Sequence, residues 1–268
     1  MTDPTTERAR SADGTEIAFE RAGDGRPLVV VGGALNTRGS AGPLVAALSS
    51  SFTVIAYDRR GRGDSGDTAP YAVGRELEDL AAVIRAVGGP VLLLGHSSGA
   101  ALALEAARGT SDVEALVVYE PPFVVDDTRA PVPDGYVQRL DELVNNGRRG
   151  EAVAYFLETG VGLPRAAVDG MRGSPMWPSL EELAHTLAYD GRVMGDRTTG
   201  RAFRPGEWDD VTVPVLVIDG GDSHPWQRSG ARALADALPN AEHLTLDGQT
   251  HDVSPAALAP AVVRFFTR

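Results

Sequence analysis

The 268-residue sequence predicts an α/β fold, with a mostly parallel central sheet flanked by helices and an all-helical insertion. Three observations carry this prediction. Short apolar, β-branched runs alternate with longer alanine-rich stretches over residues 1–120. No clear strand pattern occurs over residues 121–211, and strand–helix alternation returns over residues 212–268. We therefore expect a core made of 1–120 and 212–268, and a helical cap made of 121–211.

The first half of the chain predicts a hairpin followed by βα units. Asp13-Gly14 is a turn dipeptide, and residues 15–20 alternate between apolar and polar side chains, which is typical of an antiparallel hairpin. Buried strands are predicted at 28–31, 52–57, 91–95 and 113–119. Helices are predicted at 42–49, 73–87 and 99–108.

The second half predicts the insertion and then the rest of the sheet. About 90 residues without a strand pattern are too many for a loop, so this stretch is expected to fold as a helical unit. Helix-like segments lie around 136–145, 150–159 and 180–189. After them we expect strands at 215–218 and 243–246, and helices at 228–237 and 255–266.

Composition excludes several classes of function. The formal net charge is −12 and all basic residues are arginine, a balance that disfavours nucleic-acid binding. The absence of cysteine excludes disulfides and thiolate metal sites, and the histidines and carboxylates lack metal-ligand spacing. Gly61, Gly63 and Gly66 formally match a dinucleotide-binding pattern, but Asp64 and Asp67 would repel a pyrophosphate. We expect no cofactor and no metal.

The sequence also predicts where the protein works. Residues 1–8 contain no apolar segment typical of a signal peptide, and the apolar runs elsewhere are too short to cross a bilayer. We therefore expect a cytoplasmic protein with no membrane partner, acting on a small-molecule substrate. The sequence leaves the oligomeric state open.

Gly95-His96-Ser97-Ser98-Gly99 fits the Gly-x-Ser-x-Gly nucleophile elbow. In that motif the turn from strand to helix is so tight that glycine is needed on both sides of it. The serine hydroxyl then lies at a helix N-terminus, where a developing oxyanion is favoured. A predicted strand precedes the motif and a predicted helix follows it. This context favours Ser97 as a nucleophile over a glycine-bounded strand end.

With this motif the chain resembles the α/β-hydrolase fold family over nearly its whole length. Residues 58–65 resemble the family's Asp-x-Arg-Gly-x-Gly-x-Ser segment, to which we assign a structural role. His251, in the segment 247–252, resembles the family's catalytic histidine, which implies that it is the general base.

The resemblance also implies an oxyanion hole. Gly32-Gly33-Ala34 stands where members of the family usually carry His-Gly-x. This implies that a backbone N–H of Gly33 or Ala34 joins the N–H of Ser98 around the oxyanion. Because Gly32 replaces the usual histidine, both Gly33 and Ala34 stay candidates.

The resemblance implies two candidates for the acid that orients the histidine. In most of the family the acid follows the penultimate strand, where this chain has Asp222, one residue out of phase with the usual spacing. Haloalkane dehalogenases and zearalenone-type lactonases instead use the end of the strand after the elbow helix. That position is Glu120, which stands before two prolines at the end of a predicted buried strand. We favour Glu120 and keep Asp222 as the alternative.

Together these residues predict a carboxylic ester hydrolase. Ser97 would form an acyl-enzyme from a small, apolar ester or lactone, with His251 as base and Glu120 as orienting acid. The alternative is a non-hydrolytic protein of the same fold, such as a ligand receptor, a lyase or a cyclase. Tryptophan and methionine residues concentrate in the expected cap, where they suit either its core or an apolar pocket wall.

Overall fold

The computed structural model describes residues 5–268. Residues 1–4, which belong to the segment interpreted above as lacking a signal peptide, lie outside the described residues. The strands form one eight-stranded sheet in the order β1-β2-β4-β3-β5-β6-β7-β8. Their bounds are β1 Glu7–Arg10, β2 Glu16–Ala22, β3 Arg26–Val31, β4 Phe52–Tyr57, β5 Val91–His96, β6 Val113–Tyr119, β7 Val215–Gly220 and β8 Ala241–Leu246.

The sheet is parallel from β4 to β8 and antiparallel at one edge. β1 pairs antiparallel with β2, and β2 pairs antiparallel with β4, whereas the remaining neighbours are parallel. The expected hairpin is present, with Ser11 and Thr15 closing its turn through a 2.8 Å backbone hydrogen bond. The predicted mostly parallel α/β fold is confirmed.

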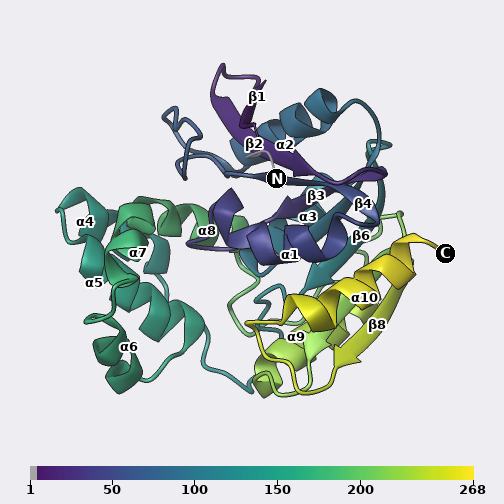
Figure 1. Ribbon diagram of the computed structural model, residues 1–268. Coiled ribbons are helices and arrows are strands. Elements are labelled where there is room, and N and C mark those ends of the chain that lie inside the picture. Colours follow the sequence, from purple (N-terminus) through teal and green to yellow (C-terminus); the bar gives the residue numbers. More distant parts are fainter. Residues whose placement is uncertain (1–4) are drawn as a thin grey trace.

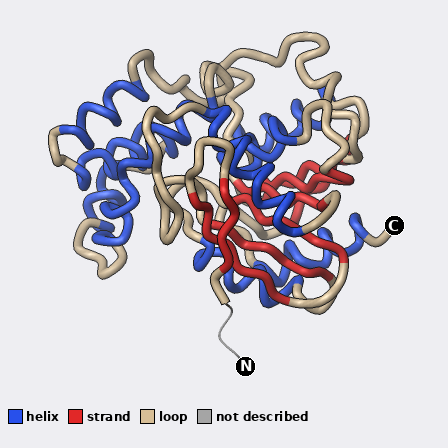
Figure 2. The backbone as a smooth tube through the Cα atoms, turned by 90° about the horizontal axis from the view of Figure 1, so that it is seen from above, coloured by secondary structure: helices blue, strands red, loops and turns tan. Residues whose placement is uncertain are grey.

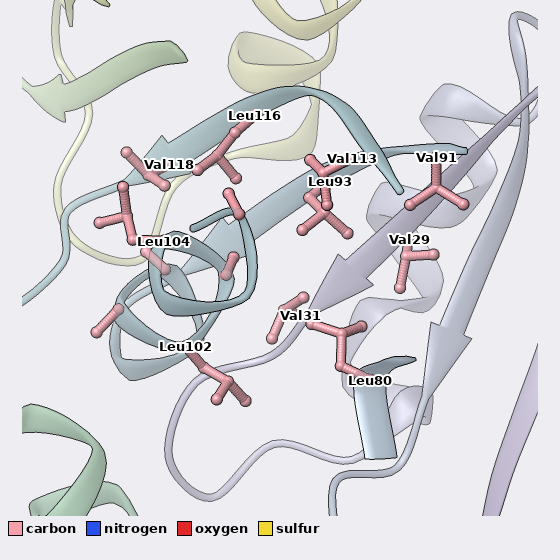
Figure 3. Close-up of a cluster of buried hydrophobic side chains, with 14 of the residues drawn as sticks. Val29, Val31, Leu80, Val91, Leu93, Leu102, Leu104, Val113, Leu116 and Val118 are labelled. Carbon is pink, nitrogen blue, oxygen red and sulfur yellow. The ribbon is translucent and has the colours of Figure 1, made fainter. Parts of the chain in front are cut away.

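Helices cover both faces of this sheet (Figure 1). Their bounds are α1 Gly42–Leu48, α2 Val73–Val87, α3 Ser98–Ala106, α9 Pro225–Ala237 and α10 Pro255–Phe266, with a short 3-10 helix, η1, at Arg38–Ala41. Side chains of α1 and α10 share one apolar cluster with the sheet, and side chains of α2, α3 and α9 share the other. Figure 3 shows part of the second cluster, in which β3, β5 and β6 face α3. This burial of alternate strand faces under helices stabilises the parallel sheet.

The segment between β6 and β7 is helical, as predicted, and contains no strand among the described residues. Its elements are α4 Tyr136–Asn145, α5 Arg149–Tyr155, η2 Phe156–Val161 (a π-helix), α6 Arg165–Met171, α7 Trp177–Leu183, η3 Ala184–Thr186 and α8 Leu187–Met194. Figures 1 and 2 show α4–α7 to one side of the sheet. A separate apolar cluster holds them together, and it includes Leu140, Val153, Trp177 and Leu187. The boundaries of the cap, 121–211, stay a prediction.

Three details of the cap differ from the sequence prediction. The helix expected at 150–159 ends at Tyr155 and continues as the π-helix η2. The helix expected at 180–189 is divided into α7, η3 and α8. Helix α6 was not predicted. These short elements depend on packing against one another, which local periodicity does not encode.

The order of the strands determines where a site can form. Because β3, β5, β6, β7 and β8 are parallel, their carboxyl ends meet at one edge of the sheet. The loops that follow these strands are where ligands bind in open α/β sheets. Each residue assigned a catalytic role from the sequence lies in one of these loops or at its border.

Candidate active site

Backbone strain marks the site. Among the described residues, the only non-glycine residues with positive φ are Leu35 at 58°, Ser97 at 56° and Glu120 at 43°. They follow β3, β5 and β6, respectively, so all three lie at the carboxyl edge of the sheet. Such conformations are costly for residues with a Cβ and cluster at functional sites, where surrounding contacts maintain them.

Glycines allow the strained turn at Ser97. A Cβ on Gly95 would lie 2.5 Å from Ala100 Cα, and one on Gly99 would lie 2.2 Å from the Val31 carbonyl oxygen. A Cβ on Gly33 would lie 2.8 Å from Ser97 Cβ. Both flanking glycines and the loop after β3 therefore pack closely around the turn at Ser97, which is the geometry expected of a nucleophile elbow.

Glu120 and His251 are hydrogen-bonded. His251 Nδ1 lies 2.8 Å from Glu120 Oε2. Since a carboxylate only accepts, Nδ1 carries the proton and Nε2 is left with its lone pair. The Glu120 side chain is fully buried and also accepts hydrogen bonds from the Gly220 amide, at 2.8 Å, and from Gln227 Nε2, at 3.1 Å. These three donors compensate a buried charge.

Two aromatic side chains hold the loop that carries His251. His96 Nε2 donates to the His251 carbonyl oxygen at 3.0 Å, and the Tyr119 hydroxyl donates to the Thr250 carbonyl oxygen at 2.6 Å. The rings of His96 and His251 lie 4.9 Å apart between centroids. Burial, together with the positive charge that His251 can carry, lowers the pKa of His96 to about 4. His96 is therefore neutral near pH 7 and serves the loop as a hydrogen-bond donor.

Ser97 and His251 open onto the same cavity, whose volume is about 510 Å³. Cap and core both contribute to its wall, and its lining includes Ala34, Ser98, Phe156 and Trp226. No hydrogen bond joins Ser97 to His251 in the described part of the chain. Catalytic hydrogen bonds are often long before substrate binds, so the shared cavity is the relevant geometry.

A smaller cavity of about 270 Å³ lies next to this site and is lined by His96, Tyr119 and Asp252 among others. Neither Ser97 nor His251 contributes to its lining. The candidate chemistry therefore belongs to the larger cavity.

The remaining predicted site residues fall into two groups. Ala34 and Ser98 line the larger cavity, whereas Gly33 lies behind Ser97 and outside the lining. Asp222 is exposed, and its backbone amide donates to the Gln249 carbonyl oxygen at 2.9 Å. Among the described hydrogen bonds, none is made by the Asp222 carboxylate.

A second histidine–carboxylate contact has no access to either cavity. His243 Nε2 lies 3.1 Å from Asp219 Oδ2, between strands β8 and β7. Both side chains are absent from the walls of the two cavities. This contact joins neighbouring strands and carries no chemistry of the site.

Sequence analysis missed a buried ion-pair cluster between the cap and the core. Asp190, on α8, lies 2.7 Å from Arg59 Nη1 and 2.7 Å from Arg62 Nη2, and it accepts a 2.7 Å hydrogen bond from the Ser98 hydroxyl. Burial alone would raise the pKa of Asp190, but the two arginines and Ser98 outweigh it and lower that pKa. Asp190 is therefore an anion held in the protein interior.

The same arginines reach the loop after β3. Arg62 Nη1 donates to the Gly33 carbonyl oxygen at 2.5 Å, and Arg59 Nη1 donates to the Gly32 carbonyl oxygen at 3.2 Å. Asp190 thus fixes two guanidinium groups that hold the candidate oxyanion loop. The sequence signal was the arginine-rich segment 58–65, but nothing local identified its partner 128 residues away.

Residues 5–268 contain no cluster of three or more histidine, cysteine, aspartate or glutamate side chains able to hold a metal ion. Over the same residues, no helix combines the length and apolar character needed to cross a membrane.

Comparisons with known proteins give consistent relatives. The chain is 26% identical to the non-heme chloroperoxidase CPO-A1 of Kitasatospora aureofaciens, over 96% of this chain and 94% of the relative. It is 27% identical to 2-(acetamidomethylene)succinate hydrolase of Mesorhizobium japonicum, over 83% of this chain and 81% of the relative.

A solved structure is more similar. The crystal structure of an alpha/beta hydrolase from Sphaerobacter thermophilus is 53% identical and superimposes with a TM-score of 0.91, covering 97% of this chain and 100% of that chain. The model of the alpha/beta hydrolase family matches residues 16–263. The chain therefore belongs to the alpha/beta hydrolase family.

Proposed function

We propose that the protein is a serine hydrolase that cleaves a small carboxylic ester or lactone through an acyl-enzyme on Ser97. One observation carries this proposal: the buried Glu120 carboxylate binds His251 Nδ1, and that histidine shares a cavity with the strained Ser97. A nucleophile, a base and an orienting acid on three loops of one sheet edge are the elements of acyl transfer.

In the proposed reaction, Ser97 Oγ attacks the acyl carbon while His251 Nε2 takes its proton. The C–O bond then breaks, and the imidazolium returns the proton to the leaving alcohol. Glu120 keeps the proton on Nδ1 and stabilises the imidazolium. Water attacks the acyl-enzyme by the same path and releases the acid. A lactone gives a single hydroxy acid because its leaving group stays attached.

The oxyanion of the tetrahedral intermediate would be bound by backbone amides. Ser98 is the first residue of α3, so its N–H has no acceptor within the helix. Ala34 lines the cavity, and its amide donates no hydrogen bond in the described part of the chain. We therefore favour Ala34 over Gly33 as the partner of Ser98. Gly33 then contributes through its close packing against Ser97.

A fluorophosphonate probe tests the proposal directly. The wild-type protein is expected to gain one covalent label, located on Ser97 by peptide mass spectrometry, and Ser97→Ala is expected to gain none. A screen of p-nitrophenyl esters of different acyl lengths, with several lactones, then identifies the substrate type. Labelling that is equal in both proteins, or absent from both, would refute the nucleophile and favour the receptor, lyase or cyclase alternative.

A further inference from the structure

Arg129 lies in the loop that follows β6 and contributes to the wall of the active-site cavity. This loop is anchored to a second segment of the chain. The Val124 amide donates to the Arg197 carbonyl oxygen at 2.8 Å, and the Val132 amide donates to the Thr198 carbonyl oxygen at 3.0 Å. Arg129 is therefore carried by a fixed backbone and not by a free surface loop.

Within residues 5–268, hydrogen bonds to the guanidinium of Arg129 involve only one of its three nitrogens, Nη2. Its Nη2 donates to the carbonyl oxygens of Thr159 and Gly160, at 2.7 and 2.8 Å, in the last turn of the π-helix η2. Its Cζ lies 4.6 Å from the ring centroid of Trp226, a stacked cation–π contact. Among the described residues, Nε and Nη1 have no acceptor, so their N–H groups are available to a ligand.

Arg129 also differs from the other arginines in charge pairing. Of the arginines in residues 5–268, it alone is partly buried and has no carboxylate within 4.0 Å; the others without such a partner are exposed. Arg192, which lines the same cavity, pairs with Asp141 at 2.6 Å. Burial lowers the pKa of Arg129, yet an arginine remains charged at neutral pH.

The carboxylates of the cavity wall do not neutralise this charge. Asp190 is held by Arg59 and Arg62, and Asp196 forms an ion pair with Arg201. Asp134 is exposed and makes no ion pair in the described part of the chain. A partly buried cation without a counter-ion is costly, and a bound anion would remove that cost.

Arg129 lines the same cavity as Ser97 and His251, and contacts connect it to Glu120. Trp226, on which it stacks, is followed in the chain by Gln227, and Gln227 donates to the Glu120 carboxylate. Nη2 already donates to two carbonyl oxygens, so the unpaired Nη1 is left to donate a charge-assisted hydrogen bond to one oxygen of a carboxylate. We propose that Arg129 forms a carboxylate-binding subsite, so that the substrate is an ester carrying a carboxylate away from its scissile bond.

This inference rests on the proposed serine hydrolase function and narrows it. The sequence predicted an apolar ester, whereas this inference predicts an ester with a carboxylate at the end away from the scissile bond. Mono-p-nitrophenyl esters of glutarate and adipate are the probes, each compared with a neutral ester in which an isopropyl group replaces the carboxylate. The measured quantity is the ratio of kcat/KM for the anionic ester to kcat/KM for its neutral counterpart, after subtraction of the uncatalysed rate.

For the better anionic probe, Arg129→Gln is expected to lower this ratio about 10- to 100-fold, because a charge-assisted pair is lost. Arg192→Gln is the matched control, since Arg192 lines the same cavity but is already paired, and it is expected to leave the ratio within about threefold. Fluorophosphonate labelling of each variant verifies that its site is folded.

The outcomes separate the two proposals. A ratio unchanged by Arg129→Gln, in a protein that hydrolyses the neutral esters, means that Arg129 only caps the π-helix, and overturns the inference alone. An equal fall of the ratio in both variants also overturns it, because general cavity charge would then explain the preference. Failure of the wild-type protein to hydrolyse any ester or to label at Ser97 would overturn the proposed function as well.

Discussion

Glu120 and His251, 131 residues apart in the sequence, meet through a 2.8 Å hydrogen bond between Oε2 and Nδ1. Glu120 has a φ of 43°, which is unfavourable for a residue with a side chain, and its carboxylate is fully buried. The Gly220 amide and Gln227 Nε2 stabilise the same carboxylate. A strained, buried acid held by two donors and aimed at a histidine has the arrangement of an orienting group.

Glu120→Gln is expected to lower kcat by three to four orders of magnitude, on the order of the loss when an orienting carboxylate becomes an amide. The amide NH₂ would face Nδ1 and favour the wrong imidazole tautomer. Steady-state hydrolysis of an activated ester measures this loss. Asp222→Asn is the matched control, because Asp222 is exposed and was the alternative acid. A collapse of kcat in Asp222→Asn with activity retained in Glu120→Gln would reverse the assignment.

Asp190 connects helix α8 to the loop after β3, the candidate oxyanion loop, through Arg59 and Arg62. Asp190→Asn is expected to destabilise the protein by about 3–5 kcal/mol, because it leaves the buried Arg62 without a counter-ion and leaves Arg59 with Glu76 alone. The folded variant should also have a lower kcat, since Arg62 no longer holds the Gly33 carbonyl in place. Urea unfolding measures the first effect, and ester hydrolysis measures the second.

Asp141→Asn is the control for this experiment, because Asp141 also pairs with an arginine of the cap but is partly exposed. Its expected effect on the free energy of unfolding is below about 1 kcal/mol. Equal destabilisation by the two variants would show that the buried cluster has no special role.

Glycine is required at position 33 because of its close contact with Ser97. In Gly33→Ala the new Cβ would meet Ser97 Cβ at 2.8 Å and the His96 carbonyl oxygen at 3.1 Å, so the loop must move away from Ser97. We expect kcat to fall by about 10²–10³, the effect of losing one oxyanion donor. In Gly32→Ala the Cβ meets only the Asn36 side chain, at 3.3 Å, and a smaller loss is expected. Equal kcat values in the two variants would exclude this packing role.

The sequence predicted those parts of the fold that depend on local patterns. The bounds of β4, β6, α2, α4 and α10 were predicted to the residue, because each has a strong apolar period and clear stop signals. The turn at Ser97 was predicted from the local spacing of Gly95 and Gly99 around the serine, although the contact that requires Gly99 is made with the distant Val31. Apolar periods, stop signals and glycine spacing can each be read within one short segment of the chain.

The parts that sequence analysis missed depend on long-range contacts. Asp190 looks like an ordinary polar residue of a cap helix until folding brings it to Arg59, Arg62 and Ser98. Nothing in the sequence indicates that Arg129 is partly buried, or that no carboxylate of the described residues pairs with it. The division of the segment 180–189 into short helices likewise follows from how the cap packs on the core. The assignment of the catalytic roles stays a prediction that the variants above address.

His96 gives the loop of His251 a defined pH dependence. Its pKa is about 4 in the folded protein against 6.5 for an ordinary histidine, so between these values the unfolded chain binds more protons. The contribution of the neutral His96 to the free energy of unfolding is complete above pH 6.5 and is lost as the pH falls towards 4. His96→Gln keeps a donor for the His251 carbonyl but has no group that titrates at this position. As the pH falls through that window, the free energy of unfolding of the wild-type protein should therefore decrease by on the order of 3 kcal/mol more than that of the variant. Urea unfolding of both proteins between pH 4.5 and 7.5 measures the difference. Parallel stability curves would mean that His96 does not need to be neutral to hold the loop.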